Sequence, residues 1–193
     1  MKIVVRLLTF WIPFSKLRKK VRSFLDCVFL CSPFYNLDII NVRMKAKKVG
    51  KRLRIGGKSK FSKSTYIGDY NAFNGIRVMG SGKFVTGNYV IGGQDILVLT
   101  QNHNYESDTI PYGKDVIKKD VIIGDCVWMG SRVTLLPGTK IGEGAIIQGG
   151  AVVHGEIPAY AIAGGNPAKV FKYRDIEHYN KLKNENKFYI PKE

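Results

Sequence analysis

The sequence predicts an all-β solenoid, in which short parallel strands wind into a coil of flat faces. From Ile117 to Gly164 an apolar residue returns every six positions, and a second, smaller apolar residue follows four positions after it. Glycine, Asn and Asp fill many positions between them, where a tight corner needs residues that tolerate positive φ. Helices and amphipathic strands have periods near 3.6 and 2 residues, so neither explains a period of six. We therefore expect a parallel β-helix.

The six-residue frame begins well before this stretch and is interrupted once. It runs from Val49 to Asn102 with apolar residues six apart as far as Leu97, and at three repeats per coil the chain has about five to six coils. The next apolar position in the frame is His103, and residues 104–116 have no repeat. This segment must leave the coil as an extruded loop. Loops on a rigid scaffold are where functional residues concentrate.

Three regions follow from this pattern. Residues 1–48 form a basic amphipathic N-terminal extension, residues 49–164 the β-helix, and residues 165–193 a C-terminal tail. In the tail, Asn166 before a proline is typical of a helix start. A short helix is expected from Asp175 to Lys183, which either covers the last coil or contacts a neighbouring subunit. With 193 residues and 45% hydrophobic content, the chain can bury one core.

Positive charge is concentrated at the start of the chain. Residues 1–60 hold 16 Lys or Arg against two acidic residues, whereas residues 61–193 hold 15 against 13. Between residues 6 and 25 the basic residues alternate with Trp, Phe and Leu, a composition suited to an anionic membrane leaflet. The same segment could cover the open end of the solenoid. Nucleic-acid binding is not expected, because no recognisable module is present.

The cysteines and the apolar runs indicate the compartment. Three cysteines make an odd number without metal-ligand spacing, so we expect no metal site and a reducing cytoplasm. The apolar runs are too short to span a bilayer, and no cleavage site of a signal peptide follows them. The expected location is the cytoplasm, with a peripheral contact at the inner membrane if the extension binds lipid.

Three further runs, taken with the break at His103, resemble a known family. They are Ile123–Ser131, Leu136–Gly142 and Ala163–Lys169. Together they resemble the left-handed β-helix O-acetyltransferases, which include galactoside, maltose, xenobiotic and surface-polysaccharide acetyltransferases. The resemblance covers roughly residues 49–170. It implies a homotrimer of left-handed β-helices with acetyl-CoA in the groove between subunits, and the left hand rests on the resemblance alone.

The chemistry of acetyl transfer assigns two candidate catalytic residues. A hydroxyl is a poor nucleophile until its proton is removed, and histidine is a base that works near neutral pH. His103 matches the family's catalytic histidine by its position before the loop, so it is the expected general base. Trp128 follows an inward-facing residue and should point outward. By resemblance it shapes the acyl site or donates a hydrogen bond; packing in the trimer is the alternative.

Candidate binding residues also follow from the resemblance. Ser131 and Gly149 match positions whose main chain contacts acetyl-CoA, and Lys169 matches a basic position near the nucleotide, with Lys172 and Arg174 as further charges. The run from Val153 to Gly155 lacks a Thr or Lys that the family often has, which removes one expected contact.

Contacts with the acceptor sugar are assigned to the loop and to an earlier coil. Tyr105, Glu106 and Asn74 are the candidates, and Tyr112 and Asn71 are further possibilities. Asn102, Glu106, Asp108 or a main-chain carbonyl could orient the ring of His103, and the sequence does not choose among them.

These features predict an acetyl-CoA-dependent O-acetyltransferase. It would transfer acetyl directly to a sugar hydroxyl of a bacterial surface polysaccharide, such as lipopolysaccharide, or its precursor. One alternative is an N-acetyltransferase of a nucleotide-linked amino sugar, although no Gly-rich nucleotide-binding signal is present in the extension. The other is a non-catalytic scaffold built of the same repeats. A pure scaffold has no need for the break at His103.

Overall fold

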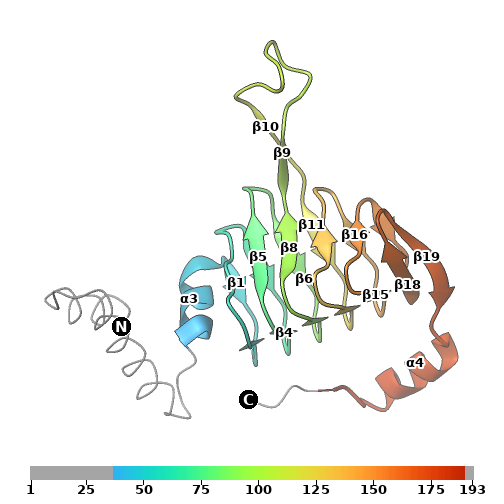
Figure 1. Cartoon of the computed structure of the whole chain (residues 1–193). Helices are drawn as coiled ribbons and strands as arrows, with labels where there is room; N and C mark the ends of the chain where they lie inside the picture. Colours follow the sequence, from blue (N-terminus) through green and yellow to red (C-terminus); the bar gives the residue numbers. More distant parts are fainter. Residues whose placement is uncertain (1–36, 190–193) are drawn as a thin grey trace, which may run out of the picture. The chain divides into compact units, whose positions relative to one another are not determined.

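The computed structural model describes residues 37–189 (Figure 1). The chain divides into two compact units, residues 1–40 and 41–193. The predicted amphipathic extension therefore lies mostly outside the described residues, and its contacts stay a prediction. The first described element is helix α3 (Leu37–Lys45), in which Val42 is buried. Within residues 37–189, no helix is both long and apolar enough to cross a bilayer.

From Lys48 onward the chain winds through three sheets in a fixed order (Figure 1). Sheet A contains, in spatial order, β1 (Lys48–Val49), β3 (Thr65–Ile67), β6 (Phe84–Thr86), β11 (Val121–Ile123), β14 (Lys140–Ile141) and β17 (Glu156–Ile157). Sheet B contains β2 (Arg54–Ile55), β4 (Ala72–Phe73), β7 (Ile91–Gly92), β12 (Trp128–Met129), β15 (Ile146–Ile147), β18 (Ala161–Gly165) and β19 (Ala168–Tyr173). Sheet C contains β5 (Ile76–Met79), β8 (Ile96–Leu99), β13 (Thr134–Leu135) and β16 (Val152–Val153). All neighbours in these sheets are parallel except β18 and β19. The predicted parallel β-helix is confirmed.

The core follows the six-residue repeat in the second half of the chain. Met129, Leu135 and Ile147 are predicted to point inward, and each has an exposed fraction of 0%. Strand residues alternate between the two faces of a sheet, so the residue before each of them points outward. One large side chain per strand therefore fills the space between the three sheets.

In the first half, the predicted frame holds from Ile55 to Phe73 and is wrong by one residue from Met79 to Leu97. Exposed or half-buried side chains stand at four predicted inward positions of this half, Met79, Val85, Ile91 and Leu97. The same is true of two predicted positions of the second half, Ile117 and Ala159. The buried residues are instead Val78, Phe84 and Ile96. The turn before Val78 is one residue shorter than the repeat requires. The next turn, around Gly80, where φ is +103°, is two residues longer. Ile117 is exposed because it belongs to the arm described below.

Asn71 is part of the core and cannot touch an acceptor, contrary to the prediction. Its exposed fraction is 0%. Its side-chain N–H groups donate to Thr86 Oγ1 at 2.7 Å and to the carbonyl of Gly87 at 3.0 Å, and its Oδ1 accepts from the N–H of Val90 at 2.7 Å. Buried polar groups are stable only when such partners are present. Asn71 therefore links two successive coils.

The tail corrects a second prediction. Asn166 does not begin a helix, because it lies in the turn between β18 and β19, and β19 extends sheet B antiparallel to β18. The helix predicted further along is confirmed as α4 (Ile176–Asn184). Asp175 caps it, since its carboxylate accepts from the N–H of His178 at 2.9 Å.

Helix α4 packs on a corner of its own chain, between sheets A and B. Residues in the left-handed conformation stack there from coil to coil: Tyr70, Tyr89, Cys126, Gly144 and Tyr160. Tyr179 lies against Gly144, where a Cβ would come within 2.9 Å of Tyr160 and 3.0 Å of Tyr179. The absence of a side chain at Gly144 therefore makes room for Tyr179.

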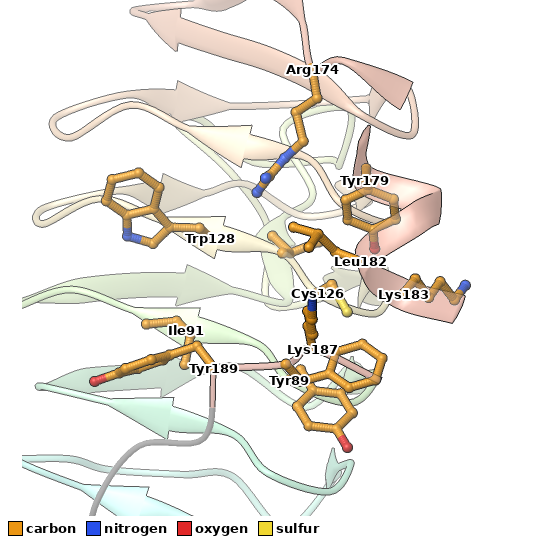
Figure 2. A pocket seen from close by; sticks show the side chains of 12 residues that line it. Tyr89, Ile91, Cys126, Trp128, Arg174, Tyr179, Leu182, Lys183, Lys187 and Tyr189 are labelled. Atoms are coloured by element: carbon orange, nitrogen blue, oxygen red, sulfur yellow. The ribbon is translucent and has the colours of Figure 1, made fainter. Parts of the chain in front are cut away.

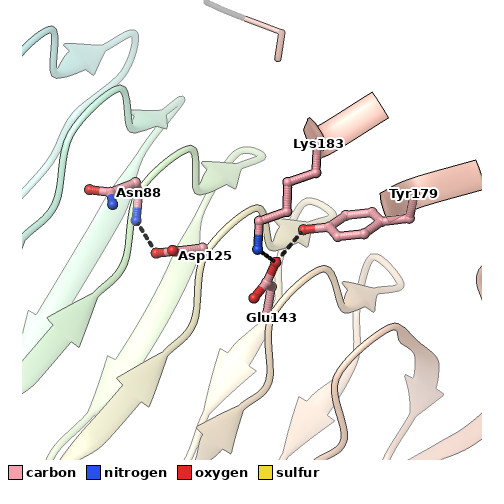
Figure 3. A network of polar contacts seen from close by, with 5 residues as sticks. All are labelled: Asn88, Asp125, Glu143, Tyr179 and Lys183. Carbon is pink, nitrogen blue, oxygen red and sulfur yellow. Dashed lines mark hydrogen bonds and ion pairs between the residues drawn. The ribbon is translucent and has the colours of Figure 1, made fainter. Parts of the chain in front are cut away.

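Polar and aromatic contacts hold the tail at this corner (Figures 2 and 3). The hydroxyl of Tyr179 donates to Glu143 at 3.1 Å, and Lys183 forms an ion pair with the same carboxylate. Burial, followed by hydrogen bonding to Cys126 and Glu143, raises the pKa of Tyr179, so the phenol stays protonated. Further along, Phe188 stacks on Tyr89 with ring centroids 4.2 Å apart.

Substitution of the buried asparagine should destabilise the protein far more than substitution of an exposed one. Asn71→Ala leaves the buried N–H of Val90 without its acceptor, so we expect a loss of about 1 to 3 kcal/mol in the free energy of unfolding. Asn74→Ala, at the exposed end of β4, should change it by less than about 0.5 kcal/mol. Denaturant unfolding followed by circular dichroism measures both. Equal stability of the two variants would contradict the role of Asn71.

The docked tail should protect the thiol of Cys126. Burial raises the pKa of Cys126, so less thiolate is present at any given pH, and alkylation should be slow, with a pH midpoint above that of an exposed thiol. In a Cys27→Ser, Cys31→Ser background, Tyr179→Ala should speed the reaction with iodoacetamide, because loss of the ring exposes the thiol and relieves the burial that raises its pKa. Tyr105→Ala, on the arm, is the control. An unchanged rate in Tyr179→Ala would show that α4 does not shield this corner.

Candidate active site

An arm leaves the solenoid at the corner between sheets C and A. Its base is a pair of antiparallel strands, β9 (Gln101–His103) and β10 (Val116–Lys118), and it stands out from the coils at the top of Figure 1. His103 pairs with Val116 at the last position of this ribbon. The histidine is therefore exposed on the arm and does not occupy an inward position of the repeat.

The imidazole of His103 is held by an aromatic ring. Tyr112 stacks on it with ring centroids 3.9 Å apart and planes 19° from parallel. Within residues 37–189, no hydrogen bond reaches the imidazole, so none of the predicted orienting side chains performs that role here. Tyr105 is 68% exposed on the same loop. The N–H of Glu106 donates to Asn104 Oδ1 at 3.1 Å, which leaves the Glu106 carboxylate exposed to solvent.

The predicted cofactor residues lie along one edge of sheet B. Ser131 follows β12 and Gly149 follows β15, so these two stand on successive coils at the same corner, and Asn74, a predicted acceptor contact, follows β4 two coils before Ser131. Lys169, on β19, pairs with Gly164 of β18 and is exposed at this edge. The structure thus brings together residues that are up to 95 positions apart in the sequence.

The main chain at this edge is tightly stacked between coils but open to solvent. The hydroxyl of Ser131 accepts from the N–H of Gln94 at 3.0 Å, and its carbonyl accepts from the N–H of Gly150 at 2.8 Å. A Cβ on Gly150 would have nothing within 4 Å. Small residues therefore leave free space beside the backbone, where an extended ligand could lie.

Trp128 points outward from sheet B, as predicted, and is 53% exposed. It stands in a column of apolar outward residues that are aligned by strand pairing: Ile91, Trp128, Ile146 and Ile162. His103 lies on the arm beyond sheet C, and no contact joins its ring to that of Trp128 in the described part of the chain. One chain therefore does not bring the two candidate catalytic side chains together.

Between Trp128 and the tail lies a partly open cavity of about 230 Å³ (Figure 2). Its walls include Tyr89, Trp128 and Tyr189, with Arg174 and Lys187 adding positive charge. The guanidinium of Arg174 lies 5.7 Å from the ring centroid of Tyr179. Arg174 was predicted to lie near a nucleotide phosphate. Its place in this cavity could not be predicted, because no local sequence pattern shows that the tail folds against the corner.

Known proteins share both the repeat and the fold. Residues 120–155 match the family described as bacterial transferase hexapeptide (six repeats). The chain is 30% identical over 144 residues to the Escherichia coli protein WbbJ, named as a lipopolysaccharide biosynthesis O-acetyl transferase, covering 69% of this chain and 70% of that protein. It is 43% identical over 76 residues to a protein of Mycobacterium tuberculosis named as an acetyltransferase, covering 39% of this chain.

The chain spans only 25% of the length of that mycobacterial relative. A solved structure, the hexapeptide-repeat acetyltransferase of Vibrio cholerae in complex with acetyl coenzyme A, aligns with a TM-score of 0.60 at 19% identity, covering 88% of this chain and 82% of that one. At this identity the likeness concerns the fold. The similarity to WbbJ extends over more than two thirds of both proteins, and on this ground the chain belongs to the hexapeptide-repeat acetyltransferase family.

Proposed function

We propose that this protein is an acetyl-CoA-dependent O-acetyltransferase that modifies a sugar hydroxyl of a bacterial surface polysaccharide or its precursor. The observation that carries the proposal is the exposed imidazole of His103, held against Tyr112 at the root of the only long interruption in the repeat between residues 48 and 165. The similarity to WbbJ, whose name refers to lipopolysaccharide biosynthesis, favours a glycan acceptor.

The reaction needs one base and no covalent enzyme intermediate. A ring nitrogen of His103 removes the proton of the acceptor hydroxyl while the oxygen attacks the thioester carbonyl. The tetrahedral intermediate collapses, the bond from carbon to sulfur breaks, and the leaving thiolate takes the proton from the imidazolium. Stacking on Tyr112 restricts the orientation of the ring, which lowers the entropic cost of reaching the reactive geometry.

Acetyl-CoA fits the glycine-rich edge of sheet B. The pantetheine arm would lie along the open main chain beside Ser131 and Gly149, and the exposed ammonium of Lys169 would contact phosphate near the nucleotide end. Tyr105 would stack on a sugar ring, and Glu106 would accept from its hydroxyls. Asn74 stands two coils before Ser131 on the same edge, so it would contact only an acceptor of several sugar units.

A homotrimer would complete the site. His103 and Trp128 project from different parts of one chain, so a neighbouring copy must bring one of them to the other. The exposed apolar side chains on the outer faces, with Trp128 53% and Ile122 41% exposed, suit burial in such an interface. In the assembled groove, the indole of Trp128 would border the acyl group.

The proposal is tested by following release of the CoA thiol with purified protein, acetyl-CoA and a panel of acceptors. Release with a neutral glycan supports O-acetylation. Release only with an amino-sugar nucleotide would replace the proposal with N-acetylation. No release, together with no CoA binding in calorimetry, would favour a scaffold.

Removal of the proposed base should abolish transfer. We expect His103→Ala to lower kcat by at least about 100-fold, because general-base catalysis supplies a factor of this size. His154→Ala is the matched control, since His154 is an exposed histidine at the turn after β16, and it should change kcat by less than about twofold. Wild-type kcat in His103→Ala would remove this residue from the mechanism.

Mixed trimers should show whether the site is shared between subunits. Neither His103→Ala nor Trp128→Ala alone should be active. After both variants are denatured and refolded together in equal amounts, each trimer containing both has one interface with an intact histidine and an intact tryptophan. About a quarter of the wild-type sites should then be active. If the mixture stays as inactive as the separate variants, both residues act within one chain or not at all.

A further inference from the structure

We infer that the N-terminal end of the solenoid is a docking surface for an anionic phospholipid membrane. The first coil and the end of α3 before it are unusually basic: residues 41–63 contain ten Lys or Arg and no acidic residue, and all ten are exposed. The observation concerns the coil itself and does not depend on residues 1–36 or on the proposed catalytic function.

The repeat distributes these cations around the coil. Lys48, Arg54 and Lys60 are six residues apart and lie on sheets A, B and C, respectively, where Lys60 bridges to Arg77 of β5. Each occupies the outward position before an inward aliphatic or aromatic residue. One exposed cation therefore stands on every face of the rod at its first coil.

The same outward positions are largely apolar or neutral in the middle of the rod. On sheet B, strand pairing aligns Arg54 with Ala72, Ile91 and Trp128. On sheet C, Lys60 and Arg77 are followed by Leu97. The positive charge thus surrounds one end of the rod and does not continue as a stripe along one side.

Among residues 37–189, these cations have no acidic partners. The ion pairs of the described chain join Lys140 with Glu156, and Lys183 and Lys187 with glutamates of the later coils and the tail, so none involves the first coil. The carboxylate of Asp69, on the next coil, accepts from the backbone N–H of Lys51, and the side chain of Lys51 remains exposed. The unneutralised charge is available to an external anion.

A ring of charge at the end of a rod fits a flat surface better than a linear polymer. A linear polyanion would follow a continuous groove, whereas all three faces of the first coil can approach a plane together. Met44, which lies between Arg43 and Lys45 on α3, is 77% exposed and adds an apolar side chain at this end. Basic residues with an exposed apolar side chain are typical of proteins that bind anionic headgroups.

The test is flotation of the full-length chain with phosphatidylcholine vesicles prepared with or without phosphatidylglycerol. The wild type should float only with the anionic vesicles, and added salt should release it. The variant Lys48→Gln, Arg54→Gln, Lys60→Gln removes one cation from each face. Because this variant loses three of the cations that attract the anionic surface, partitioning should weaken by at least about tenfold.

The matched control is Lys118→Gln, Lys119→Gln, Lys181→Gln, which removes the same number of unpaired charges from exposed positions outside the first coil. It should bind nearly as well as the wild type. Thermal melting by circular dichroism checks that both variants are folded, and CoA release with a soluble acceptor tests catalysis separately. Equal flotation of the two variants overturns the inference. So does equal binding to neutral vesicles, or binding to a soluble polyanion such as heparin without vesicle binding.

Discussion

The structure depends on the register of backbone hydrogen bonds between successive coils. Each corner bonds to the corner of the next coil, as when the N–H of Tyr89 donates to Asp69 and that of Tyr160 donates to Glu143. The same left-handed conformation must therefore recur at each level of the corner between sheets A and B. Side chains can vary there, but the backbone geometry cannot. A segment that breaks the repeat has to leave the coil, which is why the arm carrying His103 projects outward.

This constraint explains which parts of the fold could be predicted from the sequence. A strict period of six is visible in the residues themselves, and Met129 and Leu135 were predicted correctly as core. The frame around Val85 could not be followed, because a corner one residue short before Val78 and another two residues long at Gly80 together shift it by one residue, and neither corner length has a local signal. The course of the tail had no local signal, since the seat of Tyr179 is made by Gly144, 35 residues earlier.

The identities of the candidate site residues could be predicted from the sequence, but their arrangement in space could be predicted only in part. The break in the repeat singled out His103, and the frame placed Trp128 outward. The partner of His103 was missed because stacking by Tyr112 depends on the pairing of β9 with β10, which no repeat dictates. Asn74, Ser131 and Gly149, in contrast, lie at one corner because the repeat itself returns the chain to that corner in every coil.

The two ends of the solenoid differ in how their exposed edges are treated. At the C-terminal end, β19 covers β18, and α4 returns along the corner, with Lys183 neutralising Glu143. At the N-terminal end, the first coil presents cations on all three faces. The arm leaves between the third and fourth coils, at a height of about 12 Å above the first coil at ~4.8 Å per coil. If the first coil rests on a membrane, His103 would act at this height, so an acceptor anchored in lipid would have to extend by a few sugar units to reach it.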